Sequence, residues 1–566
     1  ELSRRARAGL IMKSVLFTTA LLAAASSSAF AQPTVGGGAQ LQQIPPAPTQ
    51  PKSIPDLRVE RGQAPAAPEA AGPRFVVRAL HVTGETRFPE GELIAATGFQ
   101  PGAELDLGGL RAIAARITAF YNGHGYFVAQ AYVPAQEIRD GAVTIEVIEG
   151  RYGKIALGNQ TNVSDRLAHS VLAGLEPGDV VATAPLERRL LLLSDLPGVA
   201  VKSTLTPGAV VGTSDLLVDL TPGRRVTGSL EADNAGNRYT GEYRGGATIN
   251  FNEPTGHGDV ASLRVLTAGS GLNYIRGSYQ AQVQDLTLGV AYAHLSYRLG
   301  REFSPLHASG TVDIASLYGS YPLIRSRDTD LYALADYDFR TFKDKVGSTA
   351  SVTDKTAHVA MLGLAGDHRD GFGGGGWTTW SANWSLGDLD IKTPQVRAID
   401  AVTARTQGSY NKLAFEVARL QTLSGPWSLY GSARGQLASK NLDSSEKMEL
   451  GGAYGVRAYP EGEAYGDQGY ILTAEARLRL ARLSELSGGQ VTAAAFVDNG
   501  SVTINKRPWA PGNNSRTLSA AGLGLTWADA HGLVAKVSYA VKLGNERATS
   551  APDRSGRVWV QVSKFF

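Results

Sequence analysis

The sequence has no cysteine, few charged residues and almost no long apolar run. The absence of cysteine excludes disulfide bonds, thiolate catalysis and cysteine-ligated zinc sites. Charged residues make up 19% of the 566 residues, against a usual share of about 25%, so the chain is poor in ordinary solvated surface. Apart from one short N-terminal stretch, no segment approaches the roughly 18 apolar residues that a spanning helix needs. These absences exclude a helical membrane protein and leave a β-barrel open.

An excess of charge of one sign is also missing, because 55 Lys and Arg residues face 52 Asp and Glu residues without long basic runs. This balance lacks the electrostatic footprint of a nucleic-acid-binding protein. The nine histidines form no H-E-x-x-H pattern, and neither a G-x-S-x-G elbow nor a phosphate-binding loop can be read. The sequence therefore predicts no enzyme, no metal site and no cofactor, and any export must be driven without a nucleotide.

Residues 1–31 are expected to comprise upstream residues and a secretory signal peptide. A positively charged start, an apolar stretch at 15–25 and an A-x-A ending predict cleavage after Ala31. The following residues, 32–73, are rich in Pro, Ala, Gln and Gly, which predicts an extended, poorly ordered linker. Within it, residues 39–43 are expected to form at most about one turn of helix. The mature protein is thus expected to be exported.

Two consecutive segments, 74–150 and 151–224, repeat one order of elements: strand, helix, helix, strand, strand. In the first, apolar residues recur at helical spacing between Leu110 and Phe120. In the second, Thr183 precedes a helix with a proline in its first turn, as an N-cap does. The repeat predicts two small α/β modules.

From residue 225 to 566, polar and apolar residues alternate with the period of a β-strand. In one segment Leu472 and Ala474 alternate with Thr473 and Glu475. Alternation alone fits a soluble sandwich, whose apolar face is the core, as well as a membrane barrel, whose apolar face meets lipid. Three features favour the barrel: about sixteen segments, short turns that alternate with long loops, and a last strand ending in Phe. We expect a mainly β protein with a 16-stranded antiparallel transmembrane β-barrel.

Three short sequences in the modules, LHVTG at 80–84, YNGHGY at 121–126 and VIEG at 147–150, are similar to those of POTRA domains. These are periplasmic polypeptide-binding modules of outer-membrane protein translocators. The resemblance implies that POTRA 1 spans 74–150 and POTRA 2 spans 151–224, and that an incoming chain docks as an added strand or in a helix–strand groove. The alternative is a pair of generic α/β domains that have only a structural role.

The whole chain from Arg74 resembles the transporters of two-partner secretion, the family of haemolysin secretion and activation proteins. Its most specific motifs are VRAY at 456–459 and FVDNG at 496–500. The resemblance implies that the first motif lies at the tip of a loop folded into the lumen, where Arg457 pairs with Asp498 of the barrel wall. The supporting motif residues are then Val456, Tyr459, Phe496 and Gly500.

Strand parity supports this pair, because Phe496 and Asp498 share one face and a charge there must face the lumen. An arginine fork held by a carboxylate would give the loop one defined position. The alternative is an ordinary extracellular salt bridge worth little. The family prefers Gly where this chain has Ala458, so some remodelling of the tip is expected. A pore-plugging N-terminal helix, another family feature, has no convincing counterpart in 32–73.

The expected function is a protein-conducting channel in the outer membrane of a Gram-negative cell, with the POTRA domains in the periplasm. They would capture a large haemolysin- or adhesin-like exoprotein, which then crosses the barrel in extended form. The resemblance also implies that Phe566 belongs to a C-terminal signal read by the barrel assembly machinery. The competing functions are a factor that inserts other barrels, a passive porin and a surface adhesin.

Overall fold

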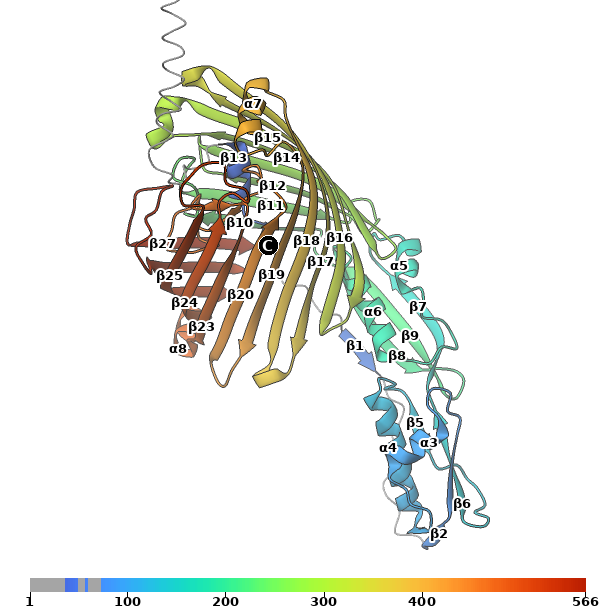
Figure 1. The fold of residues 1–566 in the computed structure, drawn as a ribbon. Coiled ribbons are helices and arrows are strands. Elements are labelled where there is room, and N and C mark those ends of the chain that lie inside the picture. Colours follow the sequence, from blue (N-terminus) through green and yellow to red (C-terminus); the bar gives the residue numbers. More distant parts are fainter. Residues whose placement is uncertain (1–35, 49–55, 60–72) are drawn as a thin grey trace, which may run out of the picture.

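The computed structural model describes residues 36–48, 56–59 and 73–566, and shows an arm of two small modules attached to one end of a barrel (Figure 1). The predicted signal peptide, residues 1–31, lies outside the described residues. Among the described residues, no helix has the length and apolarity to cross a membrane.

The first module holds two helices against small sheets of order β3-β6-β5 and β2-β4. The side chain of Asp106 accepts the amide of Gly109 and so begins the long helix. The buried face of that helix, from Leu110 to Tyr121, packs on the sheet. The elements are β2 (Phe75–Val77), β3 (Ala79–Thr83), α3 (Glu90–Thr97), β4 (Ala103–Leu105), α4 (Leu107–Gly123), β5 (Gln130–Tyr132) and β6 (Ala142–Ile148).

The second module repeats this plan with a sheet of order β1-β8-β9-β7. Its elements are β7 (Arg151–Asn159), α5 (Asp165–Leu172), α6 (Thr183–Ser194), β8 (Val199–Pro207) and β9 (Thr213–Pro222). The outermost strand, β1 (Asp56–Val59), comes from the N-terminal segment and pairs in parallel with residues 202–205 of β8. The structure thus differs from the expected extended linker, because part of 32–73 completes this sheet.

Glu149 joins the two modules. Its carboxylate is 4% exposed and accepts the amides of Thr86 and Arg87 at 2.7 and 2.8 Å and the hydroxyl of Tyr121 at 3.0 Å. Arg151 of the second module approaches it to 3.4 Å. Burial alone would raise the pKa of Glu149, but the hydrogen bonds outweigh burial and hold that pKa below its usual range.

The expected 16-stranded antiparallel barrel is confirmed: sixteen strands close into one sheet in chain order. Closure joins residues 229–233 of the first strand to residues 561–565 of the last. The strands are β10 (Val226–Asp233), β11 (Arg244–Asn252), β12 (Val260–Thr267), β13 (Leu272–Val283), β14 (Leu286–Arg298), β15 (Ala308–Arg325), β16 (Thr329–Val346), β17 (Ser351–Asp370), β18 (Gly376–Ile391), β19 (Gly408–Thr422), β20 (Trp427–Ala438), β23 (Gln468–Arg479), β24 (Gly489–Thr503), β25 (Ser515–Asp529), β26 (Leu533–Lys542) and β27 (Gly556–Phe565).

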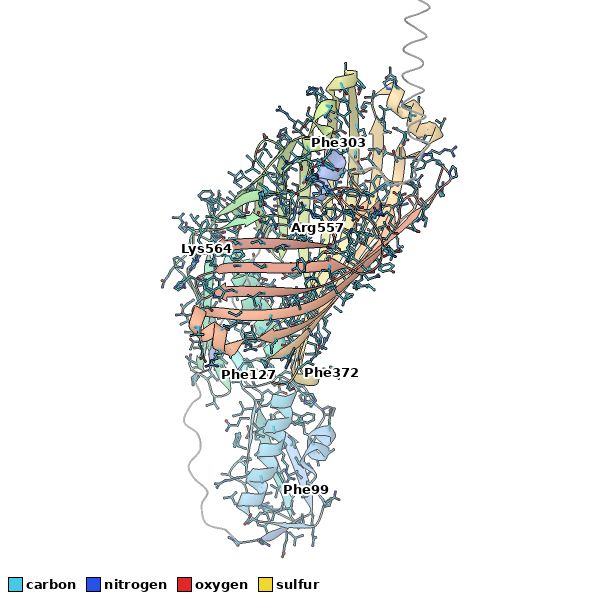
Figure 2. The ribbon with its side chains drawn as sticks, turned by 90° about the vertical axis from the view of Figure 1, so that its left-hand side faces the viewer. Phe99, Phe127, Phe303, Phe372, Arg557 and Lys564 are labelled. Carbon is cyan, nitrogen blue, oxygen red and sulfur yellow. The ribbon has the colours of Figure 1, made fainter. Side chains whose placement is uncertain are left out.

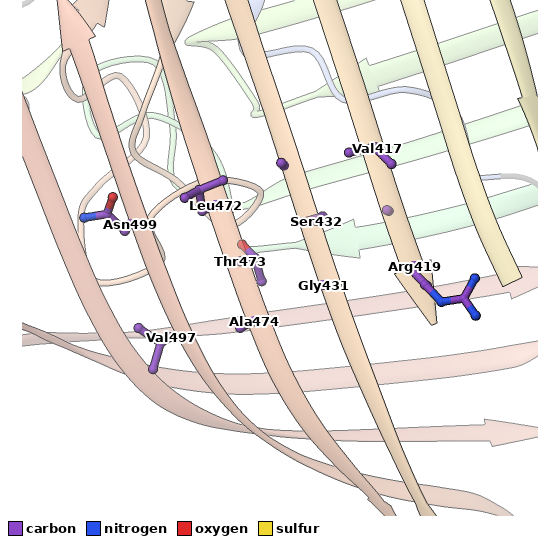
Figure 3. A pocket seen from close by; sticks show the side chains of 11 residues that line it. Val417, Arg419, Gly431, Ser432, Leu472, Thr473, Ala474, Val497 and Asn499 are labelled. Carbon is purple, nitrogen blue, oxygen red and sulfur yellow. The ribbon is translucent and has the colours of Figure 1, made fainter. Parts of the chain in front are cut away.

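The two faces of the barrel wall follow the alternation of the sequence. Leu472 and Val497 are 45% and 49% exposed on the outside, where they border a shallow apolar groove together with Val417 and Ala474 (Figure 3). On β23 the alternate residues, including Thr473 and Glu475, hydrogen-bond within the lumen. The apolar outer face suits contact with lipid, and the polar lumen suits a water-filled pore.

The connections differ at the two ends of the barrel. Figure 2 shows Phe372, in a tight turn, at the end that bears the modules, and Phe303 toward the other end. Short helices lie in both kinds of connection: η1 (Arg301–Leu306), η2 (Gly347–Thr349), η3 (Phe372–Gly374), α7 (Pro394–Val402) and α8 (Ala481–Ser487). The long loops therefore gather away from the modules, as in a barrel whose modules are periplasmic.

The second module docks on three barrel turns. Asp195, just after α6, binds Arg325 through Nε–Oδ2 and Nη2–Oδ1 contacts of 2.7 and 3.0 Å. Arg189 of α6 reaches Asp285 in the β13–β14 turn at 3.3 Å, and the amide of Ser164 donates to the carbonyl of the β11–β12 turn residue Gly256. These contacts place α6 beside the periplasmic mouth.

Candidate functional site

The candidate site is the loop 439–467, which joins β20 to β23 and folds back into the barrel. Within it β21 (Met448–Glu449) pairs with β22 (Tyr465–Gly466). All residues from 455 to 467 are buried, although a connection of this length would ordinarily be exposed. The barrel wall therefore surrounds the loop on its sides.

Arg457, at the tip of the loop, grips Asp498 of β24. Its Nε and Nη2 donate to the two carboxylate oxygens at 2.8 and 2.7 Å, and its backbone amide donates to Oδ2 at 3.2 Å. Asp498 is fully buried and also accepts the hydroxyl of Thr473 at 3.1 Å. The structure thus brings together the two residues singled out in the sequence, in the bidentate geometry that fixes an arginine best.

Two further groups complete the surroundings of the guanidinium. Glu475 of β23 accepts Nη1 of Arg457 at 2.9 Å, and the ring of Phe496 lies 3.3 Å from the guanidinium carbon. Trp559 of β27 donates its indole N–H to the carbonyl of Arg457 at 2.7 Å. Sequence reasoning missed Glu475 and Trp559 as site residues. The parity of β23, which puts Glu475 on the same face as Thr473, was the signal available for the former.

The remaining motif residues pack around this pair. Val456, Tyr459 and Phe496 belong to one buried apolar cluster, and the hydroxyl of Tyr459 donates to the carbonyl of Glu546 at 3.1 Å. A Cβ at Gly500 would come within 3.0 Å of the Leu450 side chain. The glycine therefore leaves room for that leucine. Each of these residues therefore shapes the seat of the loop.

Ala458 occupies the tip with an ordinary backbone conformation. Ala458 is fully buried and is not among the residues with positive φ in the described chain, whereas Ala464, later in the loop, has φ of 58°. An alanine therefore fits the tip without the left-handed backbone that would favour glycine.

A second anchor, unseen in the sequence, holds the descending half of the loop. The buried carboxylate of Glu463 accepts the guanidinium of Arg516 on β25. It also accepts the amides of Thr549 and Ser550 at 2.8 Å each. No motif marks Glu463, because its partners come from two segments more than fifty residues away in the chain.

An N-terminal segment shares the lumen with the loop. Residues 37–42 form α2 (Gly37–Gln42), the short blue helix inside the barrel in Figure 1. The amide of Gly37 donates to Asp344 of β16 at 2.9 Å, and a Cβ on Gly38 would lie 2.6 Å from the amide nitrogen of Ser445. The structure here differs from the expectation of an extended linker with no convincing counterpart of a pore-plugging helix, since tertiary contacts hold a helix in the lumen that its own sequence does not favour.

Two of these contacts connect the segment to the loop itself. Gln43 donates to the hydroxyl of Tyr465 at 2.8 Å, and Tyr465 donates to Glu449 at 2.8 Å. Among the described residues, no group of three or more His, Asp or Glu side chains forms a metal site. The loop and the N-terminal segment are thus joined by hydrogen bonds inside the lumen.

The C-terminal residue Phe566 closes the barrel. Its amide and carbonyl exchange hydrogen bonds of 3.1 Å with Gly228 at the start of β10, and its side chain is 41% exposed. This places the residue at the end of the barrel that faces the modules.

Two family models match the chain. The model for the haemolysin secretion/activation proteins ShlB/FhaC/HecB matches residues 212–527. The model for the ShlB-type POTRA domain matches residues 75–150. The first match covers most of the barrel and the second covers the first module.

Known proteins of similar sequence span most of the chain. The heme/hemopexin transporter protein HuxB of Haemophilus influenzae (strain 86-028NP) is 28% identical over 454 residues, covering 78% of this chain and 79% of that protein. The outer membrane transporter CdiB of Dickeya dadantii (strain 3937) is 24% identical over 462 residues, covering 79% and 80%.

Solved structures share the fold. CdiB from Escherichia coli matches with a TM-score of 0.69 and 21% identity, covering 89% of this chain and 93% of that chain. BamA from Haemophilus ducreyi lacking POTRA domains 1-3 matches with a TM-score of 0.52 and 14% identity, covering 87% and 100%.

Proposed function

This chain belongs to the family of haemolysin secretion/activation proteins, and we propose that its periplasmic modules capture the exported partner as an added β-strand. The chain is an outer-membrane transporter of two-partner secretion, with its barrel in the membrane and its POTRA domains in the periplasm. Its relatives are named as transporters. The finer steps, in which the partner is bound and the pore is opened, are the subject of the proposal.

The observation that carries the capture step is the pairing of β1 with β8. Four residues, 56–59, already add to the edge of the second module as a parallel strand. An edge strand offers a row of main-chain donors and acceptors to any extended polypeptide, whatever its sequence. An incoming partner can therefore take this position once β1 leaves.

In the same proposal, Arg457 and Asp498 hold the pore closed. A bidentate pair buried in the lumen gives the loop one position and keeps it there until the partner enters. Val456, Tyr459, Phe496 and Gly500 shape the seat, and Phe566 serves as the signal for the barrel assembly machinery. The exported protein is then a large haemolysin- or adhesin-like exoprotein.

The test uses the absence of native cysteine. Asp56 and Lys202 are register partners, so Asp56→Cys/Lys202→Cys puts a cysteine at each of two paired backbone positions. We expect oxidation to lock β1 on β8 and to reduce secretion of the co-expressed exoprotein, and reduction to restore it. The single-cysteine variants are the controls.

Secretion at the wild-type level from the fully cross-linked transporter would contradict capture at this edge. A second variant lacking residues 74–223 tests capture by the modules in general. Unchanged export by that variant would remove the modules from the mechanism altogether.

A further inference from the structure

Two lumenal arginines on neighbouring strands are each fixed by a carboxylate. Arg244 of β11 binds Asp233 at 2.9 Å, and Arg264 of β12 binds Glu231 at 3.0 Å. Both arginines are buried, with 7% and 8% exposure. Each therefore has one side of its guanidinium held by β10 and other N–H groups left for a second partner.

That second partner is the main chain of the N-terminal segment. Arg244 donates to the carbonyl of Gln43 at 2.9 Å, and Arg264 donates to the carbonyl of Pro45 at 2.7 Å. The two carbonyls belong to residues i and i+2. Gln43 is the C-cap of α2, with φ of -88° and ψ of -2°, so the two contacts lie on either side of the point where the chain leaves the helix. Neither contact involves a side chain of the segment.

The segment is suited to this mode of binding. Residues 44–48 follow α2 without helix or strand, and three of them are prolines. Proline lacks an N–H and favours an extended backbone with its carbonyls free. The arginines therefore meet a stretch of chain that offers mainly acceptors.

Two neighbouring cavities lie along the wall beside Arg264. A cavity of about 530 Å³ lies between residues 44–47 and a wall that includes Asn250, Ser262 and Arg264. A second cavity of about 430 Å³ shares Arg276, Gln280 and Tyr318 with the first and reaches Leu192 and Asp195 beside α6. The two cavities together extend from the second module to Arg264.

We propose that Arg244 and Arg264 form a binding site for the main-chain carbonyls of a polypeptide, filled at rest by residues 43–45 and during export by the passing partner. This inference rests on the proposed function and identifies where in the lumen the partner is held. Every polypeptide has main-chain carbonyls, so binding at this site does not depend on the amino-acid sequence of the bound chain. The arginines stay charged at all physiological pH values. Arg264 Nε, which has no partner among the described residues, is a spare donor.

The test measures single-channel currents of the full chain in planar bilayers. Arg264→Gln removes the donor to Pro45, and we expect the fraction of time spent open to rise about tenfold, the effect of losing one charge-assisted hydrogen bond. Arg419→Gln on β19 removes an arginine whose partners, Asp370 and Gln421, lie on the barrel wall, and is expected to leave that fraction unchanged.

The second arm adds synthetic peptides to the module side of open channels. One peptide has the sequence of residues 36–48, and another has the same length and an unrelated polar sequence. We expect both to block the current, and Arg244→Gln/Arg264→Gln to raise the blocking concentration at least tenfold for both. Glu231→Gln/Arg264→Gln, which leaves no carboxylate unpaired, guards against a folding defect, and heat-modifiable mobility verifies the barrel.

Unchanged opening in Arg264→Gln would overturn the resting contact. Loss of block by the 36–48 peptide alone, with the unrelated peptide unaffected by the substitutions, would overturn the sequence-independent site. Both readouts need only an open barrel, so they can fail while capture by the modules stands, and the cross-linking test of β1 can fail while they succeed.

Discussion

Trp559 holds Arg457 by its main chain, while Asp498 holds it by its side chain. The indole N–H of Trp559 meets the Arg457 carbonyl at 2.7 Å, and the two carboxylate contacts measure 2.7 and 2.8 Å. Trp559 belongs to β27, the strand that closes the barrel against β10. The loop tip is thus connected to the closing strand as well as to β24.

Replacing Trp559 by Phe should weaken the contacts that hold the loop tip in the lumen, while the loop stays in place. The ring remains, but the carbonyl of Arg457 loses its donor in a buried place, which costs about 1–3 kcal/mol. We expect faster cleavage of the loop by protease added outside and more frequent channel opening. Val558→Ala, on the outward face of the same strand, is the matched control. Wild-type protection of the loop in Trp559→Phe would show that this hydrogen bond has no holding role.

Arg457→Ala should leave barrel insertion intact and reduce export of the partner. The change removes the ion-pair partner of the buried Asp498, whereas Glu475 keeps Arg477 at 2.7 Å, and removing one partner of a buried ion pair costs about 3–5 kcal/mol. Arg457→Lys keeps the charge but cannot form the two-pronged contact, so we expect an intermediate loss. The measurements are heat-modifiable mobility in outer membranes and exoprotein in the medium. Full secretion by an inserted Arg457→Ala protein would count against the lock.

The Asp195–Arg325 pair should fix the second module against the barrel. Asp195→Arg places like charges together and should detach α6 from the β15–β16 turn, at a loss of about 3 kcal/mol for this mostly buried pair. The charge exchange Asp195→Arg/Arg325→Asp should recover part of it. Cross-linking between module and barrel reports the position.

The matched control for this pair is Arg139→Ala in the first module. Arg139 and Glu137 form an ion pair whose side chains are 83% and 79% exposed, and such pairs contribute little. Equal effects of Arg139→Ala and Asp195→Arg would indicate a general loss of charge instead of a specific latch.

Glu253, in the β11–β12 turn beneath the second module, should make this junction sensitive to pH. Burial, and then the nearby Asp259 carboxylate, raises the pKa of Glu253 to about 7. Because the folded pKa lies above the ordinary value of about 4.3, its stabilising effect is full at low pH and is lost as the pH rises from about 4 through 7.

Glu253→Gln should therefore stabilise the protein by about 3 kcal/mol at pH 8 and by about 1 kcal/mol or less at pH 5. Thermal unfolding at both pH values gives the comparison, with Glu137→Gln on the exposed surface as the control. A stabilisation of equal size at pH 5 and pH 8 would mean that ionisation of Glu253 plays no part.

The barrel could be predicted because each strand carries its own evidence in the sequence. The alternation around Leu472 and Thr473 indicates which face of the strand meets lipid. The corresponding alternation on β24 places Asp498 in the lumen. The motifs at 456–459 and 496–500 then indicated which loop meets which strand. Local periodicity and two short motifs were sufficient for these features.

The N-terminal segment could not be predicted in this way. Six residues, GGAQLQ, have weak helix propensity and no side-chain cap, and only the lumen supplies their partners. Glu463 is similar, because Arg516 and Ser550 reach it from distant parts of the chain. Contacts that depend on closure of the whole barrel leave no local pattern.

The pairing of β1 with β8 tethers the N-terminal segment to the second module. Between residue 48 in the lumen and residue 56 at the module lie eight steps of chain, which reach at most roughly 29 Å. While β1 stays paired with β8, this length limits how far α2 can move toward the cell surface. Movement of α2 toward the periplasm is not limited in this way. Only after β1 has left β8 can α2 move freely toward the cell surface.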